Sequence, residues 1–558
     1  MRLLKLLFSL TALFFSSVAF AQIDYIKYEY RAVWLTVIEN LDWPTTQVKS
    51  PSDIDRQKKE LVVILDSLQA LNVNCVMLQT RVRGDVIYPS SIEAFAKALT
   101  GVPGKNPGYD ALAFAIDECH KRGMQLHAWI VALPLGKAQY VRAQGKNSLV
   151  KRKPHLCRSH KEEWFMEPGE PATADYLASL VDEIVSRYDV DGIHLDYIRY
   201  PDRPSGYADG ALYRRYGNGE TLADWRRANV TGVVRRVYNT VKERKPWVRV
   251  SCAPLGKHDD LLAYSSLGWN ARRTVFQDAQ EWMRLGIMDA LFPMLYFSGN
   301  NFYPFVRDWQ EQSCGRHVAP GIGAYRLLPE YGNWDVVELK RQLLTSRAAG
   351  CAGSVMFRAR HLLDDIKGFT GVYSSIYGKR ALVPPIAWCS DSAPDTPQDF
   401  VGERRGDRLY LSWKAVPAAD GHPAVKYNIY SSVGEPVDIN NPQAMMDILL
   451  ADTAFVWEGS SLQDVHWAVT AVDAYGVESV AARWCENGVA TVLERDEFTF
   501  PEPCDWGMRI VLRDASGRLL YSTPYRMSVG VRGLPPGIYM LEVVLRNGKV
   551  IERHPFSR

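Results

Sequence analysis

The stretch Asp191-Gly192-Ile193-His194-Leu195-Asp196-Tyr197-Ile198-Arg199-Tyr200-Pro201 decides the fold of this chain. A short apolar run that ends in charged residues, aromatic residues and then proline is typical of a buried parallel strand. Because side chains alternate along a strand, Gly192, His194 and Asp196 share one face, and Ile193 and Leu195 share the other. If the apolar face packs on helices, Asp196 points inward at the carboxyl end of the strand, where (β/α)8 barrels carry out their chemistry. The alternative is a structural Asp that caps the next element.

The rest of the first 380 residues alternates between strand and helix patterns. The expected strands are Arg31–Val37, Asn74–Thr80, Gln125–Val131, Gly192–Asp196, Val248–Ala253, Ala290–Tyr296, Val318–Gly323 and Gly353–Phe357. The expected helices are Asp53–Leu71, Tyr109–Arg122, Thr173–Tyr188, Trp225–Arg244, Tyr264–Leu285 and Val336–Ala349. An open doubly wound sheet is the competing fold, but no glycine-rich phosphate loop follows the first strand. The pattern therefore predicts an α/β protein with a (β/α)8 TIM barrel, followed by C-terminal all-β modules.

The two ends of the chain have sequence patterns different from that of the predicted barrel. Residues 1–21 combine Arg2 and Lys5, an apolar run and a small-residue site at Ala19-Phe20-Ala21, which is the pattern of a cleaved signal peptide. We therefore expect a periplasmic or extracellular mature chain with no integral membrane segment. Residues 22–390 form the predicted barrel, residues 391–491 a β-sandwich and residues 492–558 a small β domain. If residues 384–397 are a true linker, a chain that ends near Ser392 should fold and melt cooperatively.

Composition limits the partners of the protein. Lys and Arg number 66 and Asp and Glu 63, a formal net charge of +3, which gives no support for a nucleic-acid surface. The nine cysteines are scattered singly, without zinc spacing. His194 and Asp196 could be two metal ligands, with His127 as a third, but no HxH or HExxH spacing supports that alternative. We predict a monomer that needs no cofactor or metal and takes an oligo- or polysaccharide as substrate.

Polar, aromatic and proline residues recur where each predicted strand ends, which is the composition of a carbohydrate site. Glycoside hydrolysis normally uses two carboxyl groups, and Asp196 is the best-placed candidate, with Asp85 or Asp42 as its partner. Glu39 and Glu167 are weaker candidates. Arg, Gln and His side chains suit sugar hydroxyls, and aromatic rings suit sugar faces. The predicted substrate-binding residues are Arg31, Trp34, Gln79, Arg81, His127, Trp129, His194, Tyr197, Arg199, Tyr296 and Tyr325.

Several motifs together resemble a known family. They are Arg31-Ala32-Val33-Trp34, Leu41-Asp42-Trp43-Pro44, Gln79-Thr80-Arg81, His127-Ala128-Trp129, residues 188–196 and Trp225-Arg226-Arg227-Ala228-Asn229-Val230. Over roughly residues 28 to 380 the chain is similar to the glycosyl-hydrolase-like family 10, a DUF187-type barrel. The resemblance implies a glycoside hydrolase that acts on a bacterial glycan, with peptidoglycan glycan strands as one proposed substrate. Many relatives carry Asp-Asp where this chain has Asp196-Tyr197, so the alternative is an inactive glycan-binding barrel that presents β-modules to partners.

The C-terminal modules show resemblances of their own. Trp413, Tyr427-Asn428-Ile429-Tyr430 and the stretch 471–479 are similar to a fibronectin type III module. Its expected strands include Leu409–Trp413, Val425–Ser431 and Val465–Val472. Residues 511–519 and 534–539 are similar to the C-terminal sorting domains of type IX secretion, and a plain extra β-module is the alternative. We predict no chemistry in the fibronectin type III-like module.

Overall fold

The computed structural model describes residues 25–202, 204–390, 392–434, 436–459 and 465–486, and after these the strands 497–499, 509–514, 519–524, 528–530, 538–544 and 550–557. The predicted signal peptide lies outside the described residues. The chain divides into two compact units, the first with residues 1–432, 436–460 and 467–484 and the second with the remainder. In the described part of the chain, no helix is both long and apolar enough to cross a membrane.

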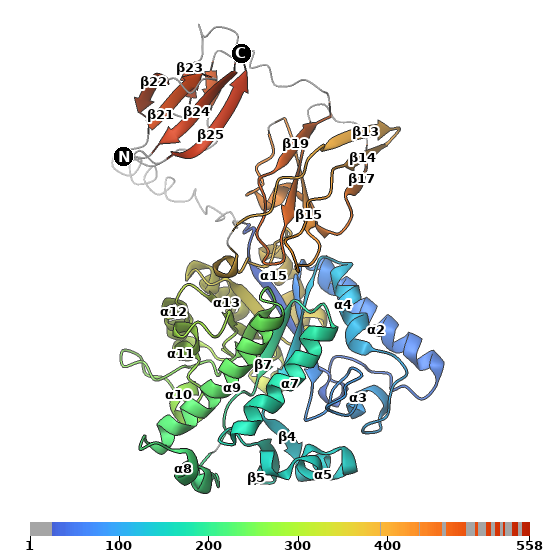
Figure 1. Ribbon diagram of the computed structural model, residues 1–558, viewed down its shortest axis with the longest axis vertical. Helices are drawn as coiled ribbons and strands as arrows, with labels where there is room; N and C mark the ends of the chain where they lie inside the picture. The colour runs from blue at the N-terminus through green and yellow to red at the C-terminus, as the bar shows by residue number, and fades with distance from the viewer. Residues whose placement is uncertain are drawn as a thin grey trace, which may run out of the picture. The chain divides into compact units, whose positions relative to one another are not determined.

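The first unit is built around one curled sheet of nine parallel strands (Figure 1). Their order is β10 (His317–Val318), β9 (Ala290–Leu291), β8 (Arg249–Ala253), β7 (Gly192–Asp196), β3 (Gln125–Val131), β2 (Cys75–Arg81), β1 (Tyr30–Leu35), β12 (Gly353–Phe357) and β11 (Gly321–Gly323). The two edge strands, β10 and β11, are separated by Ala319 and Pro320 alone. Gly321 also makes a parallel bridge to Met294, which follows β9. The sheet therefore curls until its two edges are consecutive in the chain.

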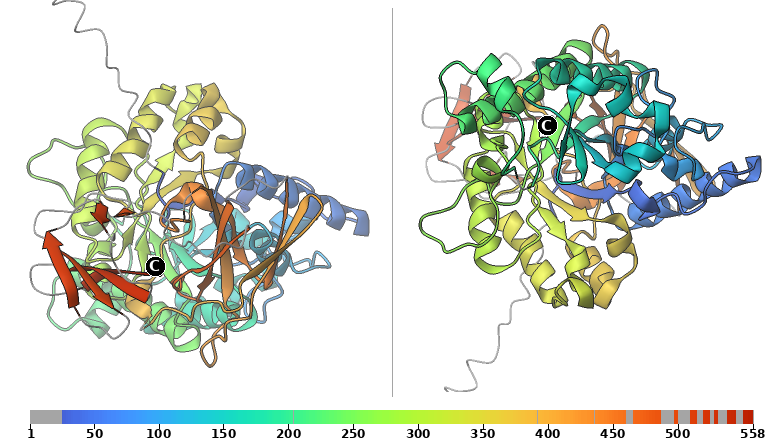
Figure 2. Two further views of the ribbon diagram at one scale, coloured as in Figure 1. Left: turned by 90° about the horizontal axis from the view of Figure 1, so that it is seen from above. Right: turned by 90° about the horizontal axis from the view of Figure 1, so that it is seen from below.

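Helices alternate with these strands and surround the sheet (Figure 2). The long ones are α2 (Pro51–Ala70), α4 (Ala111–His120), α7 (Pro171–Arg187), α9 (Leu222–Arg244) and α13 (Val336–Ala348). The shorter ones are α3 (Lys97–Thr100), α5 (Ala138–Ala143), α6 (Leu149–Arg152), α8 (Gly210–Tyr216), α12 (Tyr303–Glu311), α14 (Ala359–Leu363) and α15 (Phe369–Ile376). The five long helices confirm five of the six predicted ones, with ends shifted by a few residues.

Two sequence-based predictions were wrong in this region. The expected helix Tyr264–Leu285 is a loop followed by two short helices, α10 (Ala271–Thr274) and α11 (Ala279–Arg284). Asn270 caps α10 by accepting from the backbone N–H groups of Arg273 and Thr274, and Phe276, at φ 57°, interrupts the path between the helices. The expected strand Ala290–Tyr296 ends at Leu291, because Pro293 has no N–H to donate to a neighbouring strand.

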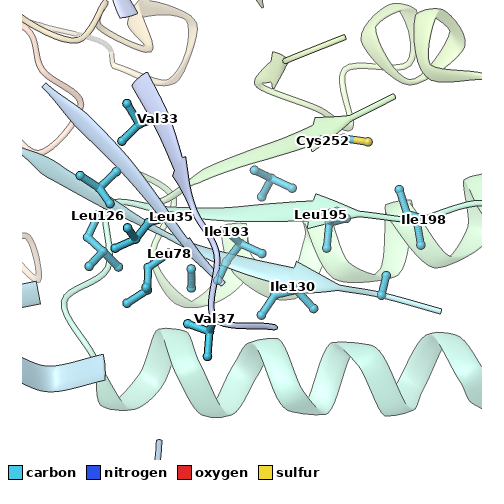
Figure 3. Close-up of a cluster of buried hydrophobic side chains, with 14 of the residues drawn as sticks. Val33, Leu35, Val37, Leu78, Leu126, Ile130, Ile193, Leu195, Ile198 and Cys252 are labelled. Carbon is cyan, nitrogen blue, oxygen red and sulfur yellow. The ribbon is translucent and has the colours of Figure 1, made fainter. Parts of the chain in front are cut away.

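The two faces of the sheet carry different side chains. Val33, Leu35, Leu126, Ile193 and Leu195 are buried on the outer face, where α7 runs alongside the strands (Figure 3). The inner face holds a separate cluster that includes Ala32, Trp34, Met77, Trp129 and Phe292. The His194 ring lies against this inner cluster, 5.6 Å from the Phe292 ring. The predicted alternation along β7 is therefore confirmed.

An insertion at the carboxyl end of β3 forms a small sheet, with α5 in its first loop. Its strands are β4 (Pro134–Lys137), β6 (Glu163–Met166) and β5 (Cys157–His160), in that order. The insertion starts next to the end of β7, because Ala132 donates its backbone N–H to the carbonyl of Asp196 at 2.8 Å. It therefore builds on the edge of the sheet that carries Asp196.

The β-region after residue 400 consists of two antiparallel sheets. One has the order β13 (Val401–Arg405), β14 (Arg408–Ser412) and β17 (Ala454–Glu458), and the other β16 (Met445–Leu450), β15 (Lys426–Val433), β18 (Val465–Val472) and β19 (Ala482–Cys485). The rings of Trp457 and Trp467, one from each sheet, lie 5.8 Å apart, so the two sheets pack face to face. The three strands expected from sequence are confirmed.

The sandwich is packed against the segment that precedes β1. The carboxylate of Glu478 is almost completely buried and pairs with the ammonium group of Lys27. The same carboxylate accepts a hydrogen bond from the Tyr28 hydroxyl at 2.5 Å. Ile386 donates its backbone N–H to the Tyr475 carbonyl at 3.0 Å. These contacts join residues on the two sides of the domain boundary predicted at residue 390. The boundary itself stays a prediction.

The second unit contains two further antiparallel sheets. Strand β20 (Glu497–Thr499) pairs with β23 (Ser528–Gly530), and the larger sheet has the order β22 (Leu519–Pro524), β21 (Arg509–Asp514), β24 (Ile538–Val544) and β25 (Val550–Ser557). Ile510, Leu512 and Leu541 are fully buried and form an apolar face. The predicted small β unit is thus present, and its role in sorting stays a prediction.

Candidate active site

Asp196 lies at the last position of β7 and is 5% exposed. Its Oδ2 accepts a hydrogen bond from the Trp129 indole N–H at 3.1 Å, and its Oδ1 accepts one from the Tyr197 backbone N–H at 2.7 Å. Burial raises the pKa of Asp196 to about 6, although the positive charge of Arg199 and these two donors act in the opposite direction. At neutral pH the carboxyl group is therefore close to its own titration midpoint.

His194 sits one pleat deeper than Asp196 and is fully buried. Its Nε2 lies 2.9 Å from the Trp34 indole nitrogen, which can only donate, and its Nδ1 lies 3.0 Å from the Ser251 hydroxyl. Burial holds the pKa of His194 well below its usual range, so the ring is neutral. Since both ring nitrogens have partners, His194 supports Trp34 and is not free to bind a metal or a sugar hydroxyl.

Two arginines flank Tyr197, the residue that follows Asp196. The Arg199 guanidinium lies 4.6 Å from the centre of the Tyr197 ring, and the Arg83 guanidinium lies 5.6 Å from it. Tyr197 has a backbone φ of 52°, in the left-handed region. Both arginines lower the pKa of Asp196, which places their charges close to its carboxyl group. The environment of Asp196 is therefore positively charged.

An aromatic group lies beside these residues, at the ends of other strands. The Tyr296 ring packs against Trp34, Tyr325 and Phe357, with centroid distances of 6.4, 5.8 and 5.2 Å. The Tyr296 hydroxyl is buried without a hydrogen-bond partner in the described structure. The negative charge of Asp196 contributes to raising the pKa of Tyr296 well above its ordinary value, after burial, so the two residues are neighbours. Trp34, Trp129, Tyr296 and Tyr325 therefore gather near Asp196, and their role as sugar contacts stays a prediction.

The other two predicted catalytic carboxylates are held by their own loops. Asp42 accepts hydrogen bonds from the Thr36 hydroxyl at 2.6 Å and the Thr36 N–H at 2.9 Å, and it forms an ion pair with Arg358. Asp85 accepts from the Tyr140 hydroxyl at 2.6 Å and from the Arg83 backbone N–H at 3.0 Å. Burial raises the pKa of Asp85 above its ordinary value. These contacts favour structural roles, in which Asp42 fixes the end of β1 and Asp85 fixes the loop that carries Arg83.

Of the weaker candidates, Glu39 is exposed, whereas Glu167 is fully buried beside Arg158.

Two of the predicted substrate-binding residues, Gln79 and Arg81, form hydrogen bonds inside the fold. Gln79 accepts from the backbone N–H groups of Val37 and Ile38, at 2.9 and 2.8 Å. The Arg81 guanidinium donates to both carboxylate oxygens of Glu93, at 2.8 and 2.7 Å. It also donates to the carbonyl of Ala132 at 2.7 Å, which ties β2 to the loop after β3. These contacts leave little of either side chain for a ligand.

Arg31 and His127 lie toward the amino ends of their strands, away from Asp196. Arg31 pairs with Glu29 at 3.1 Å and stacks on the Tyr377 ring at 4.8 Å. The His127 ring is fully buried and faces Gly192, where an added Cβ would lie 2.7 Å from the ring. Burial lowers the pKa of His127 to about 3. Gly192 is therefore required by the close approach of the histidine, and we leave both Arg31 and His127 out of the proposed site.

The structure adds Arg83 to the residues found from sequence. Arg83 follows β2 in a turn whose Gly84 has a φ of 75°, a conformation that glycine adopts without strain. The sequence pattern places Arg83 only on a loop, and the contact with Tyr197 depends on a segment more than a hundred residues later. In the part of the chain that the structure describes, no group of three or more His, Cys, Asp or Glu side chains is arranged to hold a metal ion.

The arrangement can transfer a proton to or from a polar substrate. A buried carboxyl group with a pKa of about 6 can be populated in both its protonated and its charged form near neutral pH. Trp129 fixes one oxygen and the Tyr197 N–H fixes the other, so the orientation of the group is determined before a substrate binds. The nearby rings provide apolar surface suited to sugar rings.

Comparison with known proteins gives a family and named relatives. The family described as glycosyl hydrolase-like 10 matches residues 29–318. Glycosyl hydrolase YngK of Bacillus subtilis (strain 168) is 30% identical over 390 residues, which cover 66% of this chain and 76% of that protein. Glycosyl hydrolase DigH of Escherichia coli (strain K12) is 31% identical over 367 residues, which cover 60% of this chain and 83% of that protein.

Among solved structures, an alpha-L-fucosidase, isoenzyme 2 from Paenibacillus thiaminolyticus, aligns with a TM-score of 0.42 and 18% identity, over 66% of this chain and 52% of that one. The PgaB (BpsB) glycoside hydrolase domain from Bordetella bronchiseptica aligns with a TM-score of 0.40 and 15% identity, over 61% of this chain and 99% of that one.

Proposed function

The chain belongs to the glycosyl hydrolase-like 10 family, and from this premise we propose that it is a glycoside hydrolase that cleaves a bacterial glycan outside the cytoplasm. Peptidoglycan glycan strands are the proposed substrate. The observation that carries the proposal is Asp196, a buried carboxyl group with a pKa of about 6, oriented by Trp129 among aromatic rings. We assign the proton-transfer role to Asp196, with the partly exposed Tyr296 and Tyr325 as ring contacts for sugars. Trp34, which the sequence also suggested as a contact, is 2% exposed and packs behind them.

We further propose that the curled sheet is a closed (β/α)8 barrel. The support is the position of β10 and β11, which flank β9 and β12 and follow each other in the chain. On this interpretation they are two halves of one strand, and Asp196 lies at the mouth where barrels carry out chemistry. The three- and four-stranded sheets after residue 400 support the proposal of a fibronectin type III-like module.

The proposal is tested by incubating the protein with purified bacterial glycan strands and measuring new reducing ends and product masses. Release of discrete oligosaccharides supports hydrolysis. The alternative, an inactive glycan-binding barrel, predicts that the strands bind but gain no reducing ends. A chain that neither binds nor cleaves these strands would contradict the proposed substrate.

The raised pKa of Asp196 gives a prediction about pH. A general acid must be protonated in the free enzyme, so kcat/KM should fall as the pH rises through about 6, by about tenfold per unit beyond it. If Asp196 instead served as a base or nucleophile, kcat/KM would rise through the same pH. Initial rates at low substrate concentration between pH 4 and pH 9 distinguish the two roles, and a rising limb near 6 would contradict the assignment as acid.

Trp129→Phe should shift the pH at which kcat/KM begins to fall, the falling limb of the pH profile. The indole N–H stabilises the charged form of Asp196, so its removal should raise the pKa of the carboxyl group and shift the falling limb upward by up to about one unit. Trp34→Phe is the matched control, because the Trp34 indole donates to His194. Its limb should stay in place, whatever happens to the rate. Equal shifts in both variants would show that Trp129 acts through general packing.

A further inference from the structure

The group around Tyr197 has an excess of unpaired hydrogen-bond donors. Nε and Nη1 of Arg199, Nη1 of Arg83 and the hydroxyl of Tyr296 are all buried without a partner in the described structure. Arg199 is 5% exposed, and its Nη2 pairs with Asp202 at 3.1 Å. A buried donor without an acceptor is unfavourable, so four such donors near one carboxyl group call for an acceptor that the protein does not supply.

Positive charge also exceeds negative charge beside Asp196. Arg83 and Arg199 bring two fixed positive charges, and they face Asp196, which is neutral in the acid form that the mechanism requires. The side chain of Asp202 is about half exposed, so solvent screens its charge. An anionic group on the substrate would be attracted to this place and would satisfy the free guanidinium N–H groups.

Both arginines are held in position before any ligand binds. The Asp85 carboxylate accepts the Arg83 backbone N–H at 3.0 Å, and Gln144 donates to the Arg83 carbonyl at 3.3 Å. Both guanidinium groups make cation–π contacts with the Tyr197 ring. Arg83 and Tyr197 are only half-buried, so the group is open to solvent at that side. Asp85 therefore acts as a positioning residue for Arg83.

We propose that Arg83 and Arg199 form an anion subsite next to Asp196, and that the sugar bound there carries a carboxylate. The inference rests on the proposed function for the position of the cleaved bond, and it specifies the substrate as an acidic glycan. The carboxylate would accept hydrogen bonds from Arg83 Nη1 and from Nε or Nη1 of Arg199. A uronic acid and a carboxyalkyl ether on a sugar both offer this group.

The test compares matched glycans and matched variants. Peptide-free glycan strands are used with free carboxyl groups and with the same groups capped as methyl amides, and a polyuronate serves as the second acidic source. Binding is measured by calorimetry with Asp196→Asn, and cleavage is measured by reducing ends with the unaltered protein. We expect capping to weaken binding by about 10- to 100-fold, and Arg83→Met or Arg199→Met to weaken binding of the uncapped strands to the same degree. The acidic glycan whose binding weakens in both Arg→Met variants is the one that the subsite recognises.

Arg142→Met is the control, because it removes the same charge from the exposed face of α5. It should leave binding unchanged. Equal binding of capped and uncapped strands, or full binding by both Arg→Met variants, would overturn the anion subsite even if hydrolysis is observed. Arginine-dependent binding of the acidic strands without any cleavage would support the subsite and overturn the proposed hydrolysis. Melting temperatures of the variants show whether each is folded, and Arg83→Lys provides a conservative variant that should bind between Arg83→Met and the unaltered protein.

Discussion

Asp196→Asn should reduce glycan cleavage by at least about 10²- to 10⁴-fold, the range that acid–base assistance contributes to catalysis. The amide keeps the shape of the carboxyl group and can still accept a hydrogen bond from Trp129, but it cannot deliver a proton. The folded chain should persist. Folding raises the pKa of this carboxyl group from about 4 to about 6, so its ionisation makes the folded state less stable above pH 6 than below pH 4. A neutral amide at this position therefore removes no stabilising charge. The measurements are reducing-end release per folded molecule and the melting temperature.

Asp191→Asn is the matched control, because it changes the same residue type at the opposite end of β7. The Asp191 carboxylate accepts the Leu126 backbone N–H at 2.8 Å and lies 2.8 Å from Nε2 of His120. Burial opposes the charge of Asp191, but His120, Lys426 and the Leu126 backbone N–H together outweigh it and hold the pKa below its usual range. This variant should melt at a lower temperature and keep its turnover. Full activity of Asp196→Asn, or its failure to fold, would show that Asp196 is only a structural cap.

The second large effect is expected on stability, at Glu478. Besides Lys27 and Tyr28, its carboxylate accepts hydrogen bonds from Asn428 at 2.7 Å and Thr470 at 2.7 Å. Glu478→Ala leaves the Lys27 ammonium group, whose side chain is 7% exposed, without its partner. Removal of one member of a buried ion pair costs about 3–5 kcal/mol, so the melting temperature should fall by several degrees. Calorimetric or circular-dichroism melting of the full chain measures this.

The same carboxylate should make stability depend on acid. Burial would raise the pKa of Glu478, but Lys27 and the neighbouring hydroxyl groups outweigh it and hold the pKa below its usual range. A carboxyl group of this kind stabilises the fold above its unfolded pKa, and that contribution is lost as the pH falls toward the folded value. Glu478→Ala should therefore lose less stability than the unaltered chain between pH 6 and pH 3.

Glu403→Gln is the control, because it changes a solvent-exposed partner of Arg405 and should melt as the unaltered protein does. If its melting temperature fell as much as that of Glu478→Ala, the role assigned to the buried Glu478 pair would be wrong.

These contacts also bear on the expectation that a chain ending near Ser392 folds and melts cooperatively. The shortened chain lacks Glu478, so Lys27 and Tyr28 lose their partner while the curled sheet and its helices remain. A cooperative transition at a lower temperature would fit both the predicted boundary and the buried pair. Aggregation with loss of helical circular dichroism would show that the sandwich belongs to the core of the first unit.

The sequence alone determined the alternation of strands and helices and the side of β7 on which Asp196 lies. Both follow from local rules, because a strand alternates its faces every residue and a helix repeats every 3.6 residues. Six of the eight expected strands and the inward direction of His194 and Asp196 could be predicted for this reason. The helix expected at 264–285 failed because its break depends on a cap at Asn270 and a left-handed Phe276, which periodicity does not register.

The tertiary structure alone decided which inward-facing residues form the site. Trp129 and Asp196 are 67 residues apart and meet because β3 and β7 are neighbours in the sheet. Asp85 looked catalytic in the sequence, but its partners, Tyr140 and the Arg83 backbone, turn it into a support for Arg83. Arg31, predicted to bind substrate, lies on the outer face of β1 with Val33 and Leu35, and it pairs with Glu29. A side chain's partners and its depth in the sheet depend on register and on loops from distant segments, and no local pattern in the sequence encodes these.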